Sequence, residues 1–104
     1  MSDQFIFEQQ FIATDCPVTI EMPDGSTKKA TADFKILPDS KLKDGVSSIE
    51  QLSEHIVGWN LCDDKNEALA CTDEVKLVVF DYIFIAVGFA RALMLASREA
   101  HTKN

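Results

Sequence analysis

Catalytic and metal-binding residue types are scarce in this sequence of 104 residues. Its histidines are His55 and His101, and its three cysteines, Cys16, Cys62 and Cys71, form no C-x-x-C pair. A nucleophilic site needs a base within hydrogen-bond reach and a third group to orient that base, and zinc sites favour ligands only a few residues apart. Since neither pattern is present, the sequence predicts no enzyme, no metal site and no bound cofactor. The odd, scattered cysteines favour reduced thiols over a disulfide framework.

Glycine and basic residues are also in short supply. The four glycines lie far apart in the sequence, so no glycine-rich phosphate-binding loop can be assembled from them. Seventeen acidic against ten basic residues give a formal net charge of -7. Nucleic acids and anionic membranes attract basic surfaces, and the excess of acid therefore argues against both as main partners.

Long apolar runs are missing too. The longest, Tyr82 to Ala90, has nine residues with Gly88 included, about half of the roughly 18 that a transmembrane helix needs. The first residues lack the basic start and apolar stretch of a signal peptide. With 46% hydrophobic and 26% charged residues, the chain fits one globular domain over residues 1–104. We therefore expect a soluble, intracellular protein with no membrane partner.

Alternating apolar and polar residues predict a β-hairpin over residues 16–37. Apolar residues recur at every second position in both arms, which is typical of strands with one buried face. Between the arms lies the turn sequence Pro23-Asp24-Gly25-Ser26, in which proline presets one φ angle and glycine accepts a positive φ. The alternating apolar positions are Val18, Ile20 and Met22 in the first arm and Ala30, Ala32, Phe34 and Ile36 in the second.

A short amphipathic helix is predicted over residues 47–58. Ser47 and Glu50 have the spacing of a capping box at its start. Gly58 is placed to end the helix, with Trp59 just beyond it. One face of this helix is apolar, because its apolar residues are spaced i, i+3, i+7 and i+8. These positions are Ile49, Leu52, Ile56 and Val57.

The last third of the sequence predicts a long helix over residues 73–99, with Thr72 as its N-cap. This helix is apolar on nearly every side, which is typical of a helix that is buried all round or joins a partner. We expect self-association through it, since soluble monomers rarely expose large apolar patches. The alternative is that the N-terminal segment, residues 1–15, folds back as its cover. The predicted fold class is α+β, with a hairpin, a short amphipathic helix and a long apolar helix.

Three features together resemble a known family. The hairpin ends in T-A-D-F-K-I-L over residues 31–37, the middle contains I-V-G-W-N-L over residues 56–61 followed by an acidic loop, and a final helix runs into Lys103-Asn104. This order is similar to the tail assembly chaperones of long-tailed bacteriophages, over about residues 16–104. One departure is Ala68 to Thr72, which stands where the family usually has a proline-containing turn.

The resemblance implies a non-enzymatic role in the cytoplasm of a host cell. Such chaperones coat the helical tape-measure protein during tail assembly and deliver tail-tube subunits to it, and they are commonly made in two lengths by ribosomal frameshifting. The implied partners are therefore a tape-measure protein, a tail-tube protein and further copies of the chain. Two alternatives remain open: a structural component of the virion tail, and a small acidic adaptor that masks a partner protein.

Five residues are the candidate protein contacts on this interpretation. Trp59 stands out as the chain's one tryptophan, with packing at the junction of the two helices as the alternative role. On the predicted long helix, four apolar residues approximate one line of contact, and each could instead belong to the core. These four are Phe80, Phe84, Val87 and Leu95.

Overall fold

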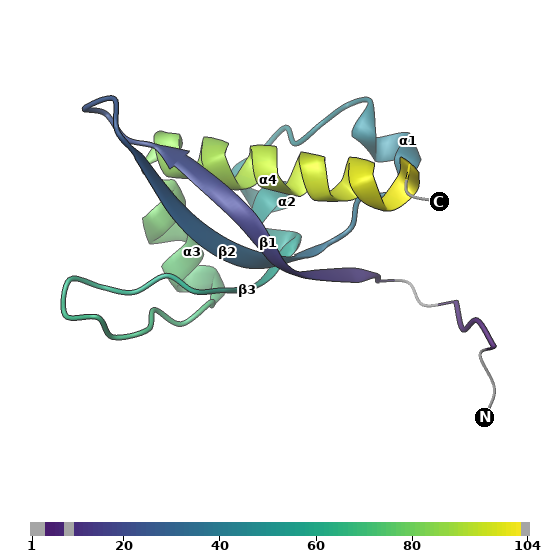
Figure 1. Ribbon diagram of the computed structural model, residues 1–104, viewed down its shortest axis with the longest axis horizontal. Coiled ribbons are helices and arrows are strands. Elements are labelled where there is room, and N and C mark those ends of the chain that lie inside the picture. The colour runs from purple at the N-terminus through teal and green to yellow at the C-terminus, as the bar shows by residue number, and fades with distance from the viewer. Residues whose placement is uncertain (1–3, 8–9, 103–104) are drawn as a thin grey trace.

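A three-stranded antiparallel sheet, one face of which is crossed by a long C-terminal helix, forms the centre of the molecule (Figure 1). The computed structural model describes residues 4–7 and 10–102. In chain order the elements are β1 (Ile12–Glu21), β2 (Thr27–Lys35), α1 (Asp39–Leu42), α2 (Ile49–Glu54), β3 (Ile56–Trp59), α3 (Asp73–Phe80) and α4 (Ile83–Thr102). The strand order is β1-β2-β3. The predicted α+β class is confirmed.

The predicted hairpin is present as β1 and β2, although β1 begins at Ile12 rather than at residue 16. Gly25 has a φ of 90° in the turn, as its sequence requires. The additional residues of β1 include a β-bulge between Ala13 and Cys16. In this bulge Asp15 has a φ of 54°, and its N–H donates to an Asp33 carboxylate oxygen at 2.8 Å. Because a bulge shifts the alternation of side chains, the period-two pattern stops at the bulge and hides the first part of the strand.

The predicted helix over residues 47–58 is wrong in its second half. Helix α2 ends at Glu54, and residues 56–59 instead form strand β3, which pairs with β2. Isoleucine and valine are β-branched and glycine is a poor helix former, so Ile56, Val57 and Gly58 gain more from pairing with an open sheet edge than from a further helical turn. The cap also lies one residue later than predicted, because Ser48 accepts the hydrogen bond from the Gln51 amide.

The predicted single helix over residues 73–99 is also wrong, because the chain bends by 113° between α3 and α4. The N-cap prediction is confirmed, since the Thr72 hydroxyl accepts a hydrogen bond from the Val75 amide at 3.3 Å. The bend explains the apolar residues on every side: α3 and α4 use different faces, and Phe80 and Phe89 enter one core with ring centroids 5.3 Å apart. A straight helix could not bring both rings to the same place.

The N-terminal segment does not cover α4. Phe5, Ile6 and Phe7 are 71%, 73% and 75% exposed, and the two phenylalanines pack against Phe11 at ring-centroid distances of 6.3 and 5.9 Å. The alternative that residues 1–15 fold back over the long helix is therefore wrong for residues 4–7, while residues 1–3 and 8–9 lie outside the described part. Strand β1 provides the cover instead, through direct packing on α4.

Helix α4 crosses β1 so closely at Gly88 that a side chain there has no room. A Cβ atom at Gly88 would lie 2.7 Å from the Thr19 carbonyl oxygen and 3.3 Å from Ile20 Cα. Both atoms belong to the strand backbone and cannot rotate away. We predict that Gly88→Val lowers the free energy of unfolding by about 2–3 kcal/mol through overpacking, as measured by urea denaturation.

The matched control for that substitution is Ala100→Val, which introduces the same side chain at an exposed position of the same helix. It should cost less than about 1 kcal/mol, the difference in helix propensity. Equal losses for the two variants would mean that the close contact between α4 and β1 does not limit stability.

Candidate functional site

The side chains that could act in catalysis or bind a metal are dispersed, and both histidines contact backbone carbonyl oxygens. His55 Nδ1 lies 3.1 Å from the Lys35 carbonyl oxygen, and His101 Nε2 lies 2.7 Å from the Leu37 carbonyl oxygen. Each histidine therefore fixes the end of β2 or the segment that follows it. Within residues 4–7 and 10–102, no three His, Cys, Asp or Glu side chains are grouped so that they could hold a metal ion.

The cysteines are free thiols with different surroundings. Burial raises the pKa of the Cys16 thiol, and the nearby Asp33 carboxylate adds to this effect. Burial also raises the pKa of the Cys71 thiol, against the opposing influence of Lys76. Because the thiolate is the reactive form, these two side chains are poorly suited to nucleophilic chemistry at neutral pH.

The acidic loop after β3 is ordered by one of its own carboxylates. An Asp63 carboxylate oxygen accepts hydrogen bonds from the amides of Lys65 at 2.8 Å and Glu67 at 2.9 Å. Asn66 takes a φ of 63° in the same turn, and Cys62 pairs with Ala68 across it. The loop is therefore a small hairpin-like turn, in which the Asp63 side chain holds the backbone.

Trp59 joins this loop to the core. Its indole Nε1 donates to the Leu69 carbonyl oxygen at 2.9 Å. Its ring packs edgewise against Phe80 and Phe89, at centroid distances of 6.1 and 6.0 Å. The side chain is half-buried, with its polar atom engaged and its ring in the aromatic cluster. Its packing here matches the alternative role at the junction of elements, and its predicted partner contact stays a prediction.

The other four candidate residues do not form a single line. Phe80 is fully buried on α3, and the bend separates it from the three candidates on α4. Phe84 is half-buried, whereas Val87 and Leu95 are 39% and 51% exposed. Phe84 and Val87 line a hollow beside Thr19 of β1, and Leu95 lines the next hollow along the same strand. The α4 residues therefore remain available for a contact, while the Phe80 side chain has no exposed surface to offer.

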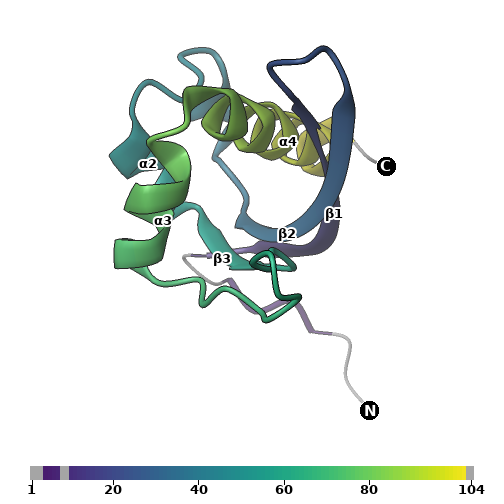
Figure 2. The same cartoon turned by 90° about the vertical axis from the view of Figure 1, so that its left-hand side faces the viewer.

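An exposed apolar surface that the sequence did not single out lies where α3 meets α4. Figure 2 shows how the two helices meet at this corner. We call this apolar surface the corner surface and define it as Leu77, Val78, Tyr82 and Ile83, which are 58%, 68%, 58% and 59% exposed. All four fall inside the predicted long helix, so the sequence marks them as apolar. Only the position of the bend decides that they, and not their neighbours, face outward.

A groove runs along α4 next to the corner surface. Its volume is about 380 Å³, and a smaller hollow of about 190 Å³ continues it toward Ile83. Its apolar floor carries two basic side chains, which are the only arginines in the sequence. We call this the α4 groove and define it as Val46, Val87, Ala90, Arg91, Met94 and Arg98.

Both α3 and α4 are rich in apolar residues. In the described residues no single helix is long and apolar enough to cross a membrane, and only the bent pair α3–α4 reaches the required length and composition together.

Comparison of the chain with protein-family models, with curated proteins and with solved structures finds no match.

Proposed function

We propose that this chain is a non-enzymatic tail assembly chaperone of a long-tailed bacteriophage, which binds apolar helices of a tape-measure protein in the host cytoplasm. The observation that carries the proposal is the corner surface. Its four large apolar side chains, each more than half exposed, lie within seven residues of the sequence. Contiguous apolar patches on soluble proteins mark interaction sites.

The shape of this region suits an amphipathic helix as its occupant. The corner surface presents apolar side chains from the end of α3 and the start of α4, and such surfaces accept the apolar face of a partner helix. Beside Leu77 lies a hollow of about 240 Å³ whose lining includes Glu50, Glu54 and Asp73. This acidic rim favours a partner helix with basic residues next to its apolar stripe.

The identity of the partner comes from the sequence resemblance described above. A tape-measure protein supplies long, aggregation-prone helices, and the chaperone family covers such helices and brings tail-tube subunits to them. The net charge of -7 would keep the complex soluble while apolar surfaces are covered. In this chain the G-W motif lies on β3, where Trp59 packs into the core. We therefore assign partner binding to the corner surface and not to the motif.

The alternative of a tail component that extends a neighbour's sheet has less support. Strand β1 is the long free edge of the sheet, but it carries Pro17 and the bulge at Asp15. Proline and bulges are devices that protect edges from pairing with another strand. An acidic adaptor would use the same surface as a chaperone. The identity of the bound partner therefore distinguishes these two functions.

Co-expression with the tape-measure protein of the same phage tests the proposed function. We predict that the chain keeps the tape-measure protein soluble and co-purifies with it. Val78→Asp should weaken this binding at least tenfold, as is typical when a central apolar contact is replaced by a charge. Binding is measured by titrating a labelled tape-measure helix with purified chain.

The control is Val57→Asp, which introduces the same charge at a 42% exposed position on β3, outside the corner surface. It should bind like the unchanged chain. If the unchanged chain does not bind the tape-measure protein, the proposed function is wrong. If both variants bind equally well, the corner surface is not the site.

A further inference from the structure

An apolar arm near the N-terminus is largely exposed to solvent. We define the N-terminal arm as residues 5–7. Phe5, Ile6 and Phe7 are 71–75% exposed, and the arm leads away from the body of the molecule, beyond the end of the sheet (Figure 1). Three consecutive large apolar side chains held in water are costly, so a surface that covers them would be strongly favoured.

The α4 groove has the chemistry to cover them. Its floor is apolar, formed by Val46, Val87, Ala90 and Met94. Arg91 and Arg98 are seven positions apart on α4, so they lie on the same side of the helix. With a volume of about 380 Å³, the groove lies within the size range of sites that enclose aromatic groups.

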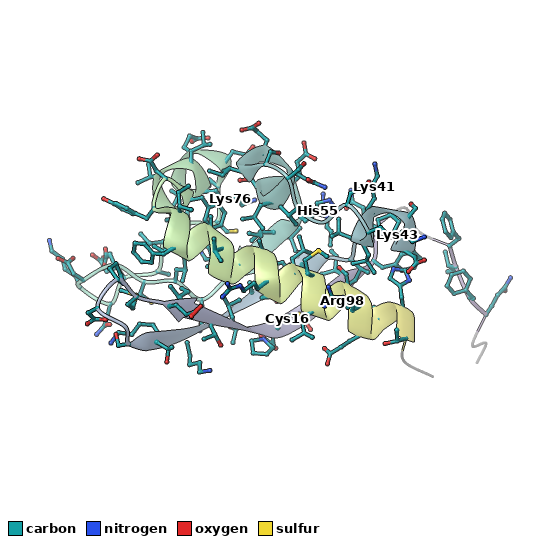
Figure 3. The ribbon with its side chains drawn as sticks, turned by 90° about the horizontal axis from the view of Figure 1, so that it is seen from above. Cys16, Lys41, Lys43, His55, Lys76 and Arg98 are labelled. Atoms are coloured by element: carbon teal, nitrogen blue, oxygen red, sulfur yellow. The ribbon has the colours of Figure 1, made fainter. Side chains whose placement is uncertain are left out.

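The charge of the groove is opposite to that of the chain as a whole. Arg98 forms no ion pair with any described residue. Arg91 pairs with Glu21 at 2.6 Å, but both side chains are exposed, at 69% and 64%, so that pair is weak and exchangeable. Figure 3 places Lys41 and Lys43 at the same end of the molecule as Arg98. A net charge of -7 therefore coexists with a basic groove.

The sequence around the arm complements this groove. Phe5-Ile6-Phe7 is flanked by Asp3 and Glu8, so an apolar core lies between two negative charges. An apolar floor with two arginines is the matching surface. Charge complementarity of this kind fixes the orientation of a docked segment and speeds its association.

We propose that the N-terminal arm of one copy of this chain docks into the α4 groove of a second copy. The arm of each copy points away from its own body (Figures 1 and 3), and Phe5 and Phe7 pack on Phe11 in that position. This direction favours an exchange between copies over a return to the same chain. The inference is independent of the proposed partner, because it does not use the corner surface.

Most of the area that the exchange would bury comes from the arms. An aromatic side chain buries about 150–250 Å² when it is enclosed. Two exchanged arms contribute two phenylalanines each, which is roughly 600–1,000 Å² of aromatic surface. A reciprocal exchange would form a closed dimer with two-fold symmetry.

Sedimentation equilibrium of the full chain over a hundredfold concentration range tests this proposal. We predict a concentration-dependent dimer for the unchanged chain. The double variant Phe5→Ser/Phe7→Ser should be monomeric, and Arg98→Glu should raise the dimer dissociation constant at least tenfold. Lys65→Glu is the matched control, since it makes the same charge change at an exposed base in the acidic loop that does not line the groove, and it should change the constant less than threefold.

Three outcomes would each overturn the proposal. They are a monomeric unchanged chain, a dimer that survives loss of the arm, and a dissociation constant that rises no more in Arg98→Glu than in the control.

Val78→Asp separates this inference from the proposed function. The corner surface lies outside the α4 groove, so this variant should dimerise like the unchanged chain even if it no longer binds a tape-measure helix. Loss of dimerisation in Val78→Asp would place the contact between copies on the corner surface and would overturn the arm exchange.

Discussion

Replacing Trp59 by alanine is expected to lower the free energy of unfolding by about 3 kcal/mol, the low end of the cost of removing a large aromatic side chain from a core, because Trp59 is half-buried. The indole packs against both Phe80 and Phe89, with centroids 6.1 and 6.0 Å away. It therefore joins three elements, β3, α3 and α4. Its Nε1–H also holds the acidic loop through the Leu69 carbonyl at 2.9 Å. Urea denaturation followed by circular dichroism measures the loss.

Trp59→Phe separates the two roles of this side chain. Phenylalanine keeps most of the aromatic packing but cannot donate to Leu69, so we expect a smaller loss, of about 1 kcal/mol for the hydrogen bond plus the reduced packing of a smaller ring. If Trp59→Ala instead leaves stability unchanged and abolishes partner binding, then Trp59 is a contact residue and its packing in the core is unimportant.

The sequence predicts elements whose pattern is set locally. The hairpin follows from alternation and from a turn in which Gly25 has the required positive φ. Thr72 caps α3 as predicted, because an N-cap depends on the few residues that follow it. These features need no knowledge of the rest of the chain.

Elements set by distant partners were not predictable in the same way. Ile56 and Val57 fit the apolar face of a helix by spacing alone, and they form β3 because the edge of β2 is free to pair with them. The bend between α3 and α4 lies at Asp81 and Tyr82, where neither proline nor glycine marks a break. Its reason is tertiary, since the bend brings Phe80 and Phe89 together.

The exposed surfaces of the candidate site could not be predicted for the same reason, because they depend on contacts between distant parts of the chain. The sequence marks the last third of the chain as apolar on nearly every side, and several of these apolar side chains are exposed in the fold. Which residues remain uncovered depends on the bend, so Phe80 enters the core while Val78 and Tyr82 stay exposed. The α4 groove could not be predicted from the sequence for a further reason. Val46 and α4 are far apart in the sequence and come together only in the fold.

Lys76→Met is expected to lower the free energy of unfolding by about 2–4 kcal/mol. Lys76 lies on α3 and is only 6% exposed. Its ammonium donates to the carbonyl oxygens of Ser53 at 2.8 Å and Ile56 at 2.6 Å, where α2 ends and β3 begins. Methionine fills a similar volume but cannot donate, so two acceptors would lose their partner, at about 1–3 kcal/mol for each that stays buried.

This lysine connects α3, which carries part of the corner surface, to the turn between α2 and β3. Its nearest carboxylate, on Asp73, lies 3.9 Å away and is 90% exposed, so the ion pair contributes little. Asp73→Asn is therefore the matched control and should cost less than about 1 kcal/mol in the same urea experiment. Losses of equal size for the two variants would mean that the ion pair, and not the bonds to the two carbonyls, explains why a lysine is buried here. If Lys76→Met is no less stable than the unchanged chain, the contact between α3 and the turn from α2 to β3 depends on apolar packing alone.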